Sequence, residues 1–577
     1  MGGGCIVLMT SVINPEQTLL AVYIGILRYI APILIFILLF RCIRPMLTFR
    51  REPEIWGWLC MPDDKKLPIT HWENVIGRSK RSDIVIDFPT VSRNHGVLTR
   101  YDDGSWTISD ADSKDGVFVN GKRVRIRALQ KDDVISIGGV EMTLQPITEH
   151  QEQRLAQLRT KASSVLRSFI NVLLLTVFQM LCCAAFLLKG EPEYAQGVLL
   201  GFGGIMVCQW LLLLFYVCIR RTSYEIETIA FFLTTMGMAA IATVTPGEAL
   251  KQLIALVLGI GLFLAIGWSL RDLERAKKFR YAATAAGIGF LLITLIFGQE
   301  YYGAKNWLII GPFSLQPSEL SKVCFVYAGA SAMDRIMTKR NMFLFIGYSA
   351  ALCGCLALMN DFGTALIFFC AFLIIAYMRS GSVGTIGLAC AAVGFAGVLV
   401  LKIAPHALQR FATWRHIWEV PLEGGYQQTR ALMCMASGGL LGLGAGQGWM
   451  KNVFAADSDV IIATLSEEWG LIMMILIVLS VASLGLFSVR SASLGRSSFY
   501  TIGSCTASAI LLVQVILNAL GTVDVVPLTG VTFPFVSNGG SSMICAWGLL
   551  AFVKAADTRQ NASFAVRLHM DRGDGDE

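Results

Sequence analysis

The feature that most constrains this chain is a series of apolar runs, each long enough to cross a lipid bilayer. The first, Leu19 to Phe40, would span ~30 Å of hydrocarbon as a helix that rises about 1.5 Å per residue. Of the 577 residues, 54% are hydrophobic and only 15% are charged, which excludes a single compact water-soluble protein. About twelve further runs lie near 168–188, 194–219, 226–244, 248–268, 281–298, 318–337, 342–359, 362–378, 383–403, 461–489, 499–520 and 542–556. We therefore predict a polytopic α-helical membrane protein with about 13 transmembrane helices.

Basic residues predict how these helices are oriented. Arg41, Arg44, Arg50 and Arg51 follow the first run, so the positive-inside rule places its C-terminal end in the cytoplasm. The run lacks the preceding positive charge and the cleavage site of a signal peptide, so residues 1–50 are expected to be an uncleaved anchor. Later basic clusters fall in alternate loops, as this orientation requires. The mixed charges of residues 557–577 predict a disordered cytoplasmic tail.

Residues 51–148 differ from the rest in composition. Short alternating segments, such as Val117 to Val119, are separated by turn pairs such as Asn120-Gly121. Many short strands over so few residues predict a β-sandwich, on the cytoplasmic side of the anchor. A charged linker, 149–167, leads from this module to the next apolar run.

Four short motifs follow one another within the predicted sandwich: Gly77-Arg78, Ser92-Arg93-Asn94-His95, Ser113-Lys114-Asp115-Gly116 and Val119-Asn120-Gly121. In order and spacing they resemble a forkhead-associated (FHA) domain. The resemblance implies recognition of a phosphothreonine protein, and so a Ser/Thr kinase, with the peptide bound by Arg78, Ser92, Arg93, His95, Ser113, Lys114 and Asp115. Arg78 and Ser92 would hold the phosphate through charge-assisted hydrogen bonds, and His95 would support the loop from behind.

Two residues depart from the FHA pattern. Asp115 stands where asparagine is usual, and Val117 stands where threonine is usual. An additional carboxylate beside a phosphate dianion is expected to weaken binding, because the two charges repel. The alternative interpretation is a degenerate sandwich that serves as a spacer or a protein-docking face.

Charged residues gather where the later apolar runs meet the predicted outer face. Asp361, Asp457 and Asp459 begin two of these runs, and Glu467-Glu468 lies inside one. Carboxylates within a span are costly unless they are paired or hydrated, so they usually face a cavity. Cations on the same side are Lys305, Lys402, Arg410, Arg415, Arg430 and Lys451. Acids beside cations at a lipid interface suit an anionic, lipid-linked substrate.

Two loops on the predicted outer side are candidates for the site. One is Glu300 to Pro317, and the other is the longer stretch Ala404 to Ser458, which is rich in glycine and is expected to be non-helical. Such backbone near a membrane surface is tolerated where it lines a cavity or faces water.

A second set of motifs lies within residues 225–556. They are Gly303 to Trp307, Gln316 to Glu319 with Lys322, Asp361 to Thr364, Gly424 to Tyr426, Ser437 to Leu440, Ser458-Asp459, Glu467 to Gly470, Pro527 to Gly530, and Pro534 with Ser537 to Ser541. In this order they resemble the SEDS family (shape, elongation, division and sporulation; FtsW, RodA and SpoVE). The resemblance implies the family's core of ten spans, so the hairpin at 168–224 is additional.

The SEDS resemblance implies a peptidoglycan glycosyltransferase of the bacterial plasma membrane that polymerises lipid II at the outer face. Asp459 would be the general base that accepts the proton of the acceptor sugar's 4-hydroxyl. Arg410 is expected to bind the leaving pyrophosphate, with Lys305 and a divalent cation (Mg or Mn) as weaker candidates. The implied partner is a class B penicillin-binding transpeptidase, because this activity makes glycan chains only.

The other residues of these motifs are candidates for substrate contact: Trp307, Glu319, Lys322, Asp361, Glu467 and Ser537. For several of them a structural role is also open. Glu319 and Lys322 lie one turn apart and could form an ion pair on one helix face. Asp361 could cap the helix that follows it. Glu467 and Glu468 lie too far along the helix from Asp459 to share its proton, and they are expected to brace the cavity.

Two other functions fit the same sequence. Many spans with charges in the membrane also suit a lipid II flippase or another secondary transporter, and a catalytically silent scaffold could recruit phosphorylated partners to the wall machinery. Nucleic-acid binding is not expected, because no long basic block is present. Most cysteines lie in apolar runs without any CxxC pair, which favours small buried hydrophobes over a zinc or redox site.

Overall fold

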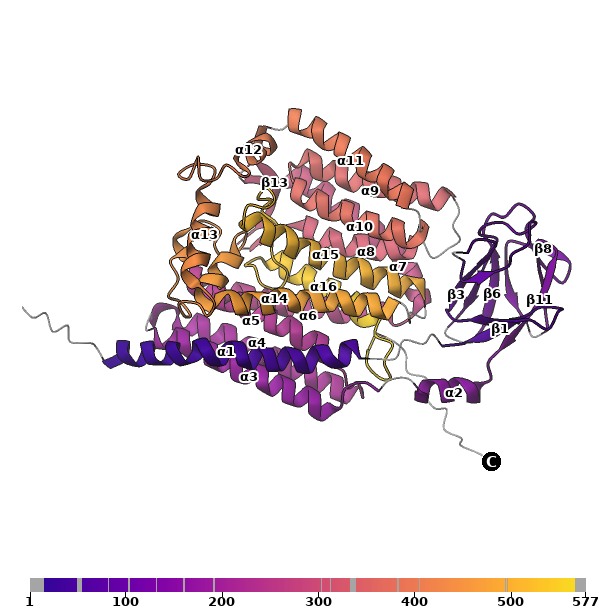
Figure 1. Ribbon diagram of the computed structural model, residues 1–577, viewed down its shortest axis with the longest axis horizontal. Helices are drawn as coiled ribbons and strands as arrows, with labels where there is room; N and C mark the ends of the chain where they lie inside the picture. Colours follow the sequence, from indigo (N-terminus) through magenta and orange to yellow (C-terminus); the bar gives the residue numbers. More distant parts are fainter. Residues whose placement is uncertain are drawn as a thin grey trace, which may run out of the picture.

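The protein consists of a large helical body with a β-sandwich at one end, as the computed structural model shows (Figure 1). The structure describes residues 15–48, 54–80, 82–101, 104–130, 132–158, 161–189, 192–301, 303–311, 313–332, 339–380, 383–403, 405–492, 494 and 497–565. The helices of the body run roughly parallel to one another, and the sandwich lies beyond one end of them (Figure 1).

Thirteen long helices build the body among the described residues. They are α1 (Pro15–Leu47), α3 (Val165–Leu188), α4 (Pro192–Cys218), α5 (Glu225–Val244), α6 (Ala249–Leu270), α7 (Leu273–Phe297), α8 (Pro317–Ala332), α9 (Lys339–Leu358), α10 (Phe362–Ser380), α11 (Val383–Ile403), α14 (Ile461–Ala492), α15 (Ser498–Thr522) and α16 (Gly540–Ala555). Nine of them are long and apolar enough to cross a membrane. The predicted polytopic helical fold is confirmed.

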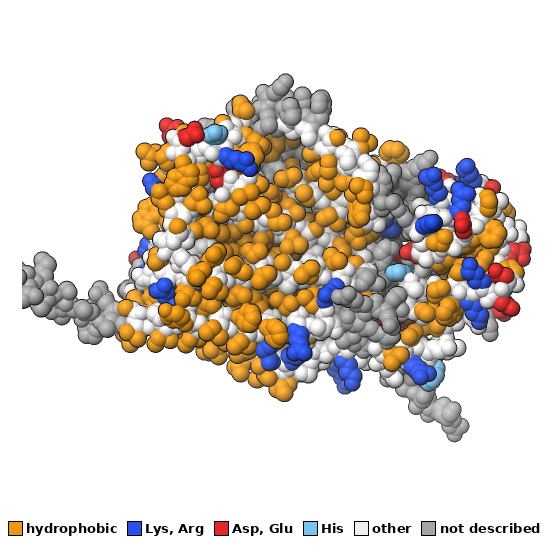
Figure 2. Space-filling model, viewed as in Figure 1, with side chains coloured by type: hydrophobic (Ala, Val, Ile, Leu, Met, Phe, Trp, Pro, Cys, Tyr) orange, Lys and Arg blue, Asp and Glu red, His pale blue; other side chains and the backbone are white. Residues whose placement is uncertain are grey.

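The outside of the helical body is apolar. Hydrophobic side chains cover most of the visible face, whereas charged side chains gather on the sandwich and at the body's margins (Figure 2). Large exposed side chains such as Phe36, Leu211 and Leu214 suit contact with lipid. Helix α5 is different, because it lies at the centre and almost all of its residues are buried.

Two sheets, antiparallel except for one pair of strands, form the sandwich. The predicted β-sandwich is therefore confirmed. One has the strand order β2-β1-β11-β10-β7-β8 and the other β4-β3-β5-β6-β9, with β3 and β4 paired in parallel. Inward-facing side chains such as Leu59, Leu98 and Ile135 form the core between them. The strands are β1 (Gly57–Cys60), β2 (Lys66–Ile69), β3 (Glu73–Gly77), β4 (Ile84–Val85), β5 (Gly96–Arg100), β6 (Trp106–Asp110), β7 (Val117–Val119), β8 (Lys122–Val124), β9 (Ile126–Leu129), β10 (Val134–Ile137) and β11 (Val140–Pro146).

The two loops expected on the outer side are more regular than the sequence predicted. The first forms a small antiparallel sheet of β12 (Gln299–Tyr301), β13 (Ala304–Ile310) and β14 (Phe313–Leu315). The second, expected to be glycine-rich and non-helical, contains α12 (Pro405–Thr413) and α13 (Tyr426–Gly438). The prediction of non-helical backbone from the glycines was therefore wrong, because the glycines interrupt this segment but leave stretches between them that form helices.

Polar contacts join the sandwich to the helical body. Arg100 is buried between Trp56 and Trp72 and forms an ion pair of 2.9 Å with Glu152 on the linker helix α2 (Glu149–Leu158). The carboxylate of Glu73 accepts hydrogen bonds from Ser497 and Ser498, which lie at the start of α15. The sandwich therefore rests against the end of the body where α14 finishes and α15 begins.

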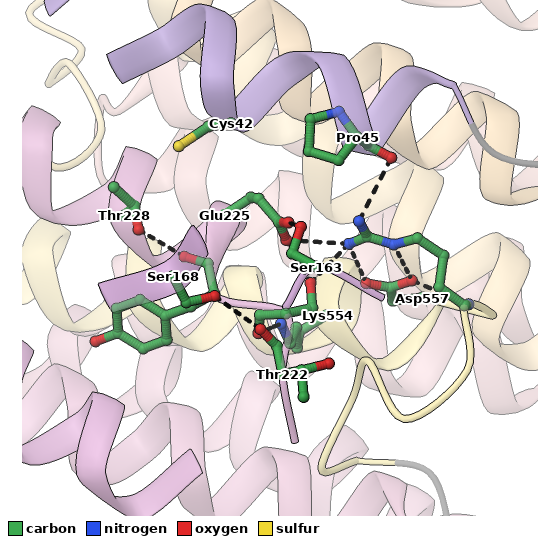
Figure 3. Close-up of polar contacts among 12 residues, drawn as sticks. Cys42, Pro45, Ser163, Ser168, Thr222, Glu225, Thr228, Lys554 and Asp557 are labelled. Atoms are coloured by element: carbon green, nitrogen blue, oxygen red, sulfur yellow. Dashed lines mark hydrogen bonds and ion pairs between the residues drawn. The ribbon is translucent and has the colours of Figure 1, made fainter. Parts of the chain in front are cut away.

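A buried charge cluster lies at the same end of the body (Figure 3). Arg559 pairs with Asp557 at 2.7 Å and with Glu225 at 3.3 Å, and it also donates to the carbonyl of Pro45 on α1. Ser163, just before α3, donates to Glu225. The prediction of a disordered tail from residue 557 is therefore wrong for residues 557–565, which pack into the body; residues 566–577 lie outside the described part of the chain.

Candidate functional site

Asp459 lies in a tight turn immediately before α14. The carbonyl of Ala455 accepts hydrogen bonds from the amides of Asp459 (3.1 Å) and Val460 (3.3 Å), and Ala455 itself has a positive φ of 56°. The turn thus ends where the long helix begins. Because α14 extends for 32 residues to the sandwich end, the Asp459 turn and the sandwich lie at opposite ends of the body (Figure 1).

Three side chains from two other segments hold this turn. Asn518 on α15 donates to the carbonyl of Asp459 at 2.9 Å. Ser537 donates to the carbonyl of Ser458 at 2.8 Å. Asn538 donates to the carboxylate of Asp457 at 2.8 Å. Every residue from 457 to 459 is therefore fixed by a separate contact, and Ser537, expected to contact substrate, lies buried beneath the turn.

The turn faces a loop and a cation that come from distant parts of the sequence. A Cβ at Gly530, where φ is 68°, would lie 3.4 Å from the carboxylate oxygen Oδ2 of Asp459. Arg410 on α12 is exposed and donates to the carbonyl of the neighbouring Thr529 at 3.3 Å. The structure therefore brings together Asp459, the predicted base, and Arg410, the residue expected to bind the pyrophosphate.

The electrostatic surroundings of Asp459 set its proton affinity. Burial raises the pKa of Asp459 from 3.8 to about 6; the positive charge of Arg410 lowers the pKa, and the negative charge of Asp457 raises it further. A carboxyl group with this pKa is mostly deprotonated at neutral pH and still binds a proton far better than an ordinary aspartate. This is the property that a general base requires.

Glu467 and Glu468 point into the glycine-rich loop that precedes the turn. The carboxylate of Glu467 accepts from the amide of Met450 at 2.8 Å, and that of Glu468 accepts from Thr243 at 3.0 Å and from the amide of Gly448 at 3.4 Å. Both are 1% exposed. Their carboxylates thus brace the chain that leads to Asp459.

Three other residues that are expected to contact substrate, Lys305, Trp307 and Asp361, make internal contacts. Lys305 donates from Nζ to the carbonyl of Leu295 at 2.8 Å, where a cation favours the C-terminal end of α7. Asp361 caps α10 by accepting from the amide of Thr364 at 3.1 Å, and it also accepts from Gln316 at 3.4 Å. Trp307 lies half-buried on β13, paired with β12.

Glu319 and Lys322 form a separate pair inside the body. Their side chains meet at 2.7 Å on α8, and they are 5% and 1% exposed. The ion pair predicted from their spacing is therefore present. Oε2 of Glu319 is buried without a hydrogen-bond partner among the described residues.

The residues expected to bind phosphothreonine gather on three neighbouring loops of the sandwich. The buried His95 accepts from the amide of Ser92 at 3.0 Å and contacts the carbonyl of Gly116 at 3.0 Å through its other ring nitrogen, so it links two of these loops. The hydroxyl of Ser92 accepts from the amide of Lys114 at 3.2 Å. Ser113 turns inward to Asp110. The exposed side chains are Arg78, Arg93, Lys114 and Asp115.

Asn518 was missed by the sequence analysis, although a polar amide within an apolar run needs hydrogen-bond partners and is therefore a usable signal. Thr529 and Asn538 lie within the motifs Pro527 to Gly530 and Ser537 to Ser541, but no role was predicted for either residue. For a divalent cation, the described residues contain no group of three or more His, Cys, Asp or Glu side chains that could hold a metal ion.

Comparison with known proteins defines the two parts of the chain. Residues 229–562 match the cell cycle protein family of FtsW, RodA and SpoVE, and residues 74–138 match the FHA domain. The chain belongs to the FtsW/RodA/SpoVE family. Ten of the described long helices, α5 to α11 and α14 to α16, fall in or overlap the matched region, whereas α1, α3 and α4 lie outside it.

Curated relatives agree with this assignment. The peptidoglycan glycosyltransferase RodA of Mycobacterium tuberculosis (strain ATCC 25618 / H37Rv) is 29% identical, over 53% of this chain and 69% of the relative. The probable peptidoglycan glycosyltransferase FtsW of Nitrosococcus halophilus (strain Nc4) is 32% identical, over 52% and 81%. Stage V sporulation protein E of Bacillus subtilis (strain 168) is 33% identical, over 45% and 75%.

Proposed function

We propose that this protein is a peptidoglycan glycosyltransferase that polymerises lipid II at the outer face of the bacterial plasma membrane. The observation that carries the proposal is the convergence of Asp459, Arg410 and the Thr529-Gly530 loop at one end of the helical body. The names of the relatives support the reaction class. The position of the sandwich at the other end supports a cytoplasmic FHA domain opposite an extracellular site.

In the proposed reaction, Asp459 is the general base. Its carboxylate accepts the proton of the acceptor sugar's 4-hydroxyl while that oxygen forms a bond to the anomeric carbon of the donor. The bond from this carbon to the pyrophosphate oxygen breaks, and undecaprenyl pyrophosphate leaves. Arg410 stabilises the negative charge on the leaving group, because a guanidinium donates paired, charge-assisted hydrogen bonds to phosphate oxygens.

The test is polymerisation by the purified full-length protein supplied with lipid II. The wild type should make glycan strands, and Asp459→Asn should lose about 10² to 10⁴ of the rate, as expected for a positioned base. Asp524→Asn is a matched control, because Asp524 contacts the backbone of Arg415 at the same end of the body. A wild type that moves lipid II across the membrane without lengthening it would instead support a flippase.

We further propose that the sandwich binds a phosphothreonine protein and thereby localises the polymerase. The exposed Arg78, the partly exposed Ser92 and the brace through His95 support this function. The terminal segment 557–577 contains one threonine, Thr558, which stands between the buried residues Asp557 and Arg559. The phosphorylated partner is therefore expected in another chain, modified by a Ser/Thr kinase, rather than in this terminal segment.

Binding of phosphothreonine peptides to the full-length protein tests this second proposal. Arg78→Ala should abolish measurable binding, because a guanidinium supplies paired, charge-assisted hydrogen bonds to phosphate. Arg125→Ala, at an exposed position of the same sandwich, is the control. Equal affinity in wild type and Arg78→Ala would favour a docking or spacer role. A class B penicillin-binding transpeptidase is the partner proposed for crosslinking the strands.

A further inference from the structure

Arg28 is a charged residue within the apolar helix α1 that neither the FHA match nor the family match includes. Its Nε atom is buried and has no hydrogen-bond partner in the part of the chain that the structure describes. A charged side chain within a membrane span is costly unless it meets an opposite charge or a hydrated cavity. The position of Arg28 therefore requires an explanation.

Arg28 lines a small cavity of about 10 Å³ together with Glu468. This volume is near that needed to hold one water molecule. Glu468 is 1% exposed, and the donors that reach its carboxylate, Thr243 and the amides of Gly446 and Gly448, are neutral groups. The cavity thus has a guanidinium on one wall and a deeply buried carboxylate on another.

Helix α1 also touches the glycine-rich loop that Glu468 holds. A Cβ at Gly444, where φ is 116°, would lie 2.1 Å from Cγ2 of Ile24. The amide of Gly444 donates to the carbonyl of Glu468 at 2.9 Å, and Leu441 and Ala445 line the same cavity as Arg28. The loop is therefore enclosed between α1 on one side and α14 on the other.

We propose that Arg28 is the countercharge of Glu468, directly or through one water molecule, and that α1 is thereby a positioning element for loop 439–450. This loop leads into the turn that presents Asp459. Without α1, the buried Glu468 would lose this cation, and the loop would lose one of its two walls. The consequence for catalysis rests on the proposed glycosyltransferase function, whereas the pairing itself does not.

Hydrogen–deuterium exchange of the full-length protein in lipid nanodiscs measures the pairing without substrate. Arg28→Met and Glu468→Gln should each accelerate exchange of the amides in 439–450 by about tenfold, and the double variant should exchange no faster than the faster single variant, because one interaction is lost only once. Arg28→Lys should remain close to the wild type. Arg41→Met is the matched control, since Arg41 lies on α1 but contacts Asn171 near the other end.

Unchanged exchange in Arg28→Met, equal acceleration in Arg28→Lys, or effects that multiply in the double variant would each overturn the pairing. In parallel, Arg28→Met should lower kcat for lipid II polymerisation more than it changes KM. If the wild type makes no glycan while the exchange pattern holds, the proposed function fails and the pairing stands. If the wild type polymerises but the exchange pattern is absent, the pairing fails alone.

Discussion

The side-chain amide of Asn518 donates a hydrogen bond of 2.9 Å to the backbone carbonyl of Asp459. The same nitrogen donates at 2.8 Å to the carbonyl of Val531, next to the loop of Thr529 and Gly530. One amide therefore ties the turn that carries the proposed base to the loop that meets Arg410. Small displacements of a catalytic group are costly, so this tie makes Asn518 a positioning residue.

Replacement of Asn518 by leucine should reduce polymerisation without removing the base. We expect kcat to fall by about 10²-fold and KM to change little, because the variant frees the turn but leaves Asp459 and Arg410 in place. Lipid II polymerisation by the purified protein measures both constants. Thr522→Val is the control, because the Thr522 hydroxyl donates to the backbone carbonyl of Asn518 within α15. A wild-type rate for Asn518→Leu would contradict this role.

The pH dependence of polymerisation should show the titration of Asp459. The active form of a base is deprotonated, and its pKa of about 6 predicts that the rate falls as pH decreases through this value. Arg410 lowers this pKa and Asp457 raises it. In Arg410→Met the acid limb should therefore move to higher pH, and in Asp457→Asn to lower pH.

The measurement is kcat/KM for lipid II from about pH 5 to 8, a range that brackets the expected value. Shifts in the same direction for both variants would contradict the opposite signs of the two charges. The raised pKa also implies that the ionised Asp459 lowers folding stability at neutral pH. This loss of stability shrinks as pH falls below the folded pKa of about 6 and vanishes below the ordinary value of 3.8. Asp459→Asn should accordingly raise Tm at pH 7.

The sequence predicted the helices well because, in lipid, an apolar run satisfies its own backbone hydrogen bonds by forming a helix. Every backbone group must be satisfied within the segment, so a run such as 499–520 becomes the helix Ser498–Thr522. The sandwich was also predictable, because its turn pairs set the strand boundaries. The sheet β12-β13-β14 was not, since three short strands carry too little periodicity to distinguish them from a loop.

The functional site was predictable only in part. The motifs indicated Asp459 and Arg410, but their meeting depends on a contact between Arg410 and Thr529, which are 119 positions apart. No local pattern encodes such a contact. For Lys305 the prediction and the structure differ. Its charge suggested that it binds the pyrophosphate, whereas its amine donates to the carbonyl of Leu295.

Phosphopeptide affinity should increase in Asp115→Asn. Asp115 is exposed beside Lys114 on the loop that reaches Ser92, and its charge would repel a phosphate dianion. Removal of the charge should strengthen binding by about threefold to tenfold at low salt, and the gain should shrink as ionic strength rises. Titration with a phosphothreonine peptide at two salt concentrations measures this.

Asp112→Asn is the matched control for this substitution, because Asp112 is exposed on the same loop two residues before Lys114. Its φ of 62° is a conformation that asparagine adopts readily, so the backbone should be undisturbed. An equal gain from both substitutions would indicate a general charge effect rather than a contact at the phosphate. Weaker binding by Asp115→Asn would show that the carboxylate itself accepts hydrogen bonds from the peptide.

The buried cluster around Arg559 should be essential for stability. Arg559 is 4% exposed and contacts Asp557, Glu225 and the carbonyl of Pro45, so it joins the terminal segment to α5 and α1. Arg559→Met would leave two carboxylates buried without this cation. Loss of one partner of a buried ion pair costs about 3–5 kcal/mol.

We therefore expect a large decrease in the Tm of the purified protein for Arg559→Met. Arg220→Met should leave Tm almost unchanged, because Arg220 is an exposed basic residue between α4 and α5. The double variant Arg559→Met, Asp557→Asn should recover part of the loss, since it removes one of the two charges left unpaired. A Tm for Arg559→Met equal to that of the wild type would mean that the carboxylates are neutral in the folded protein, and that the terminal segment is held by packing of side chains such as Phe564 instead.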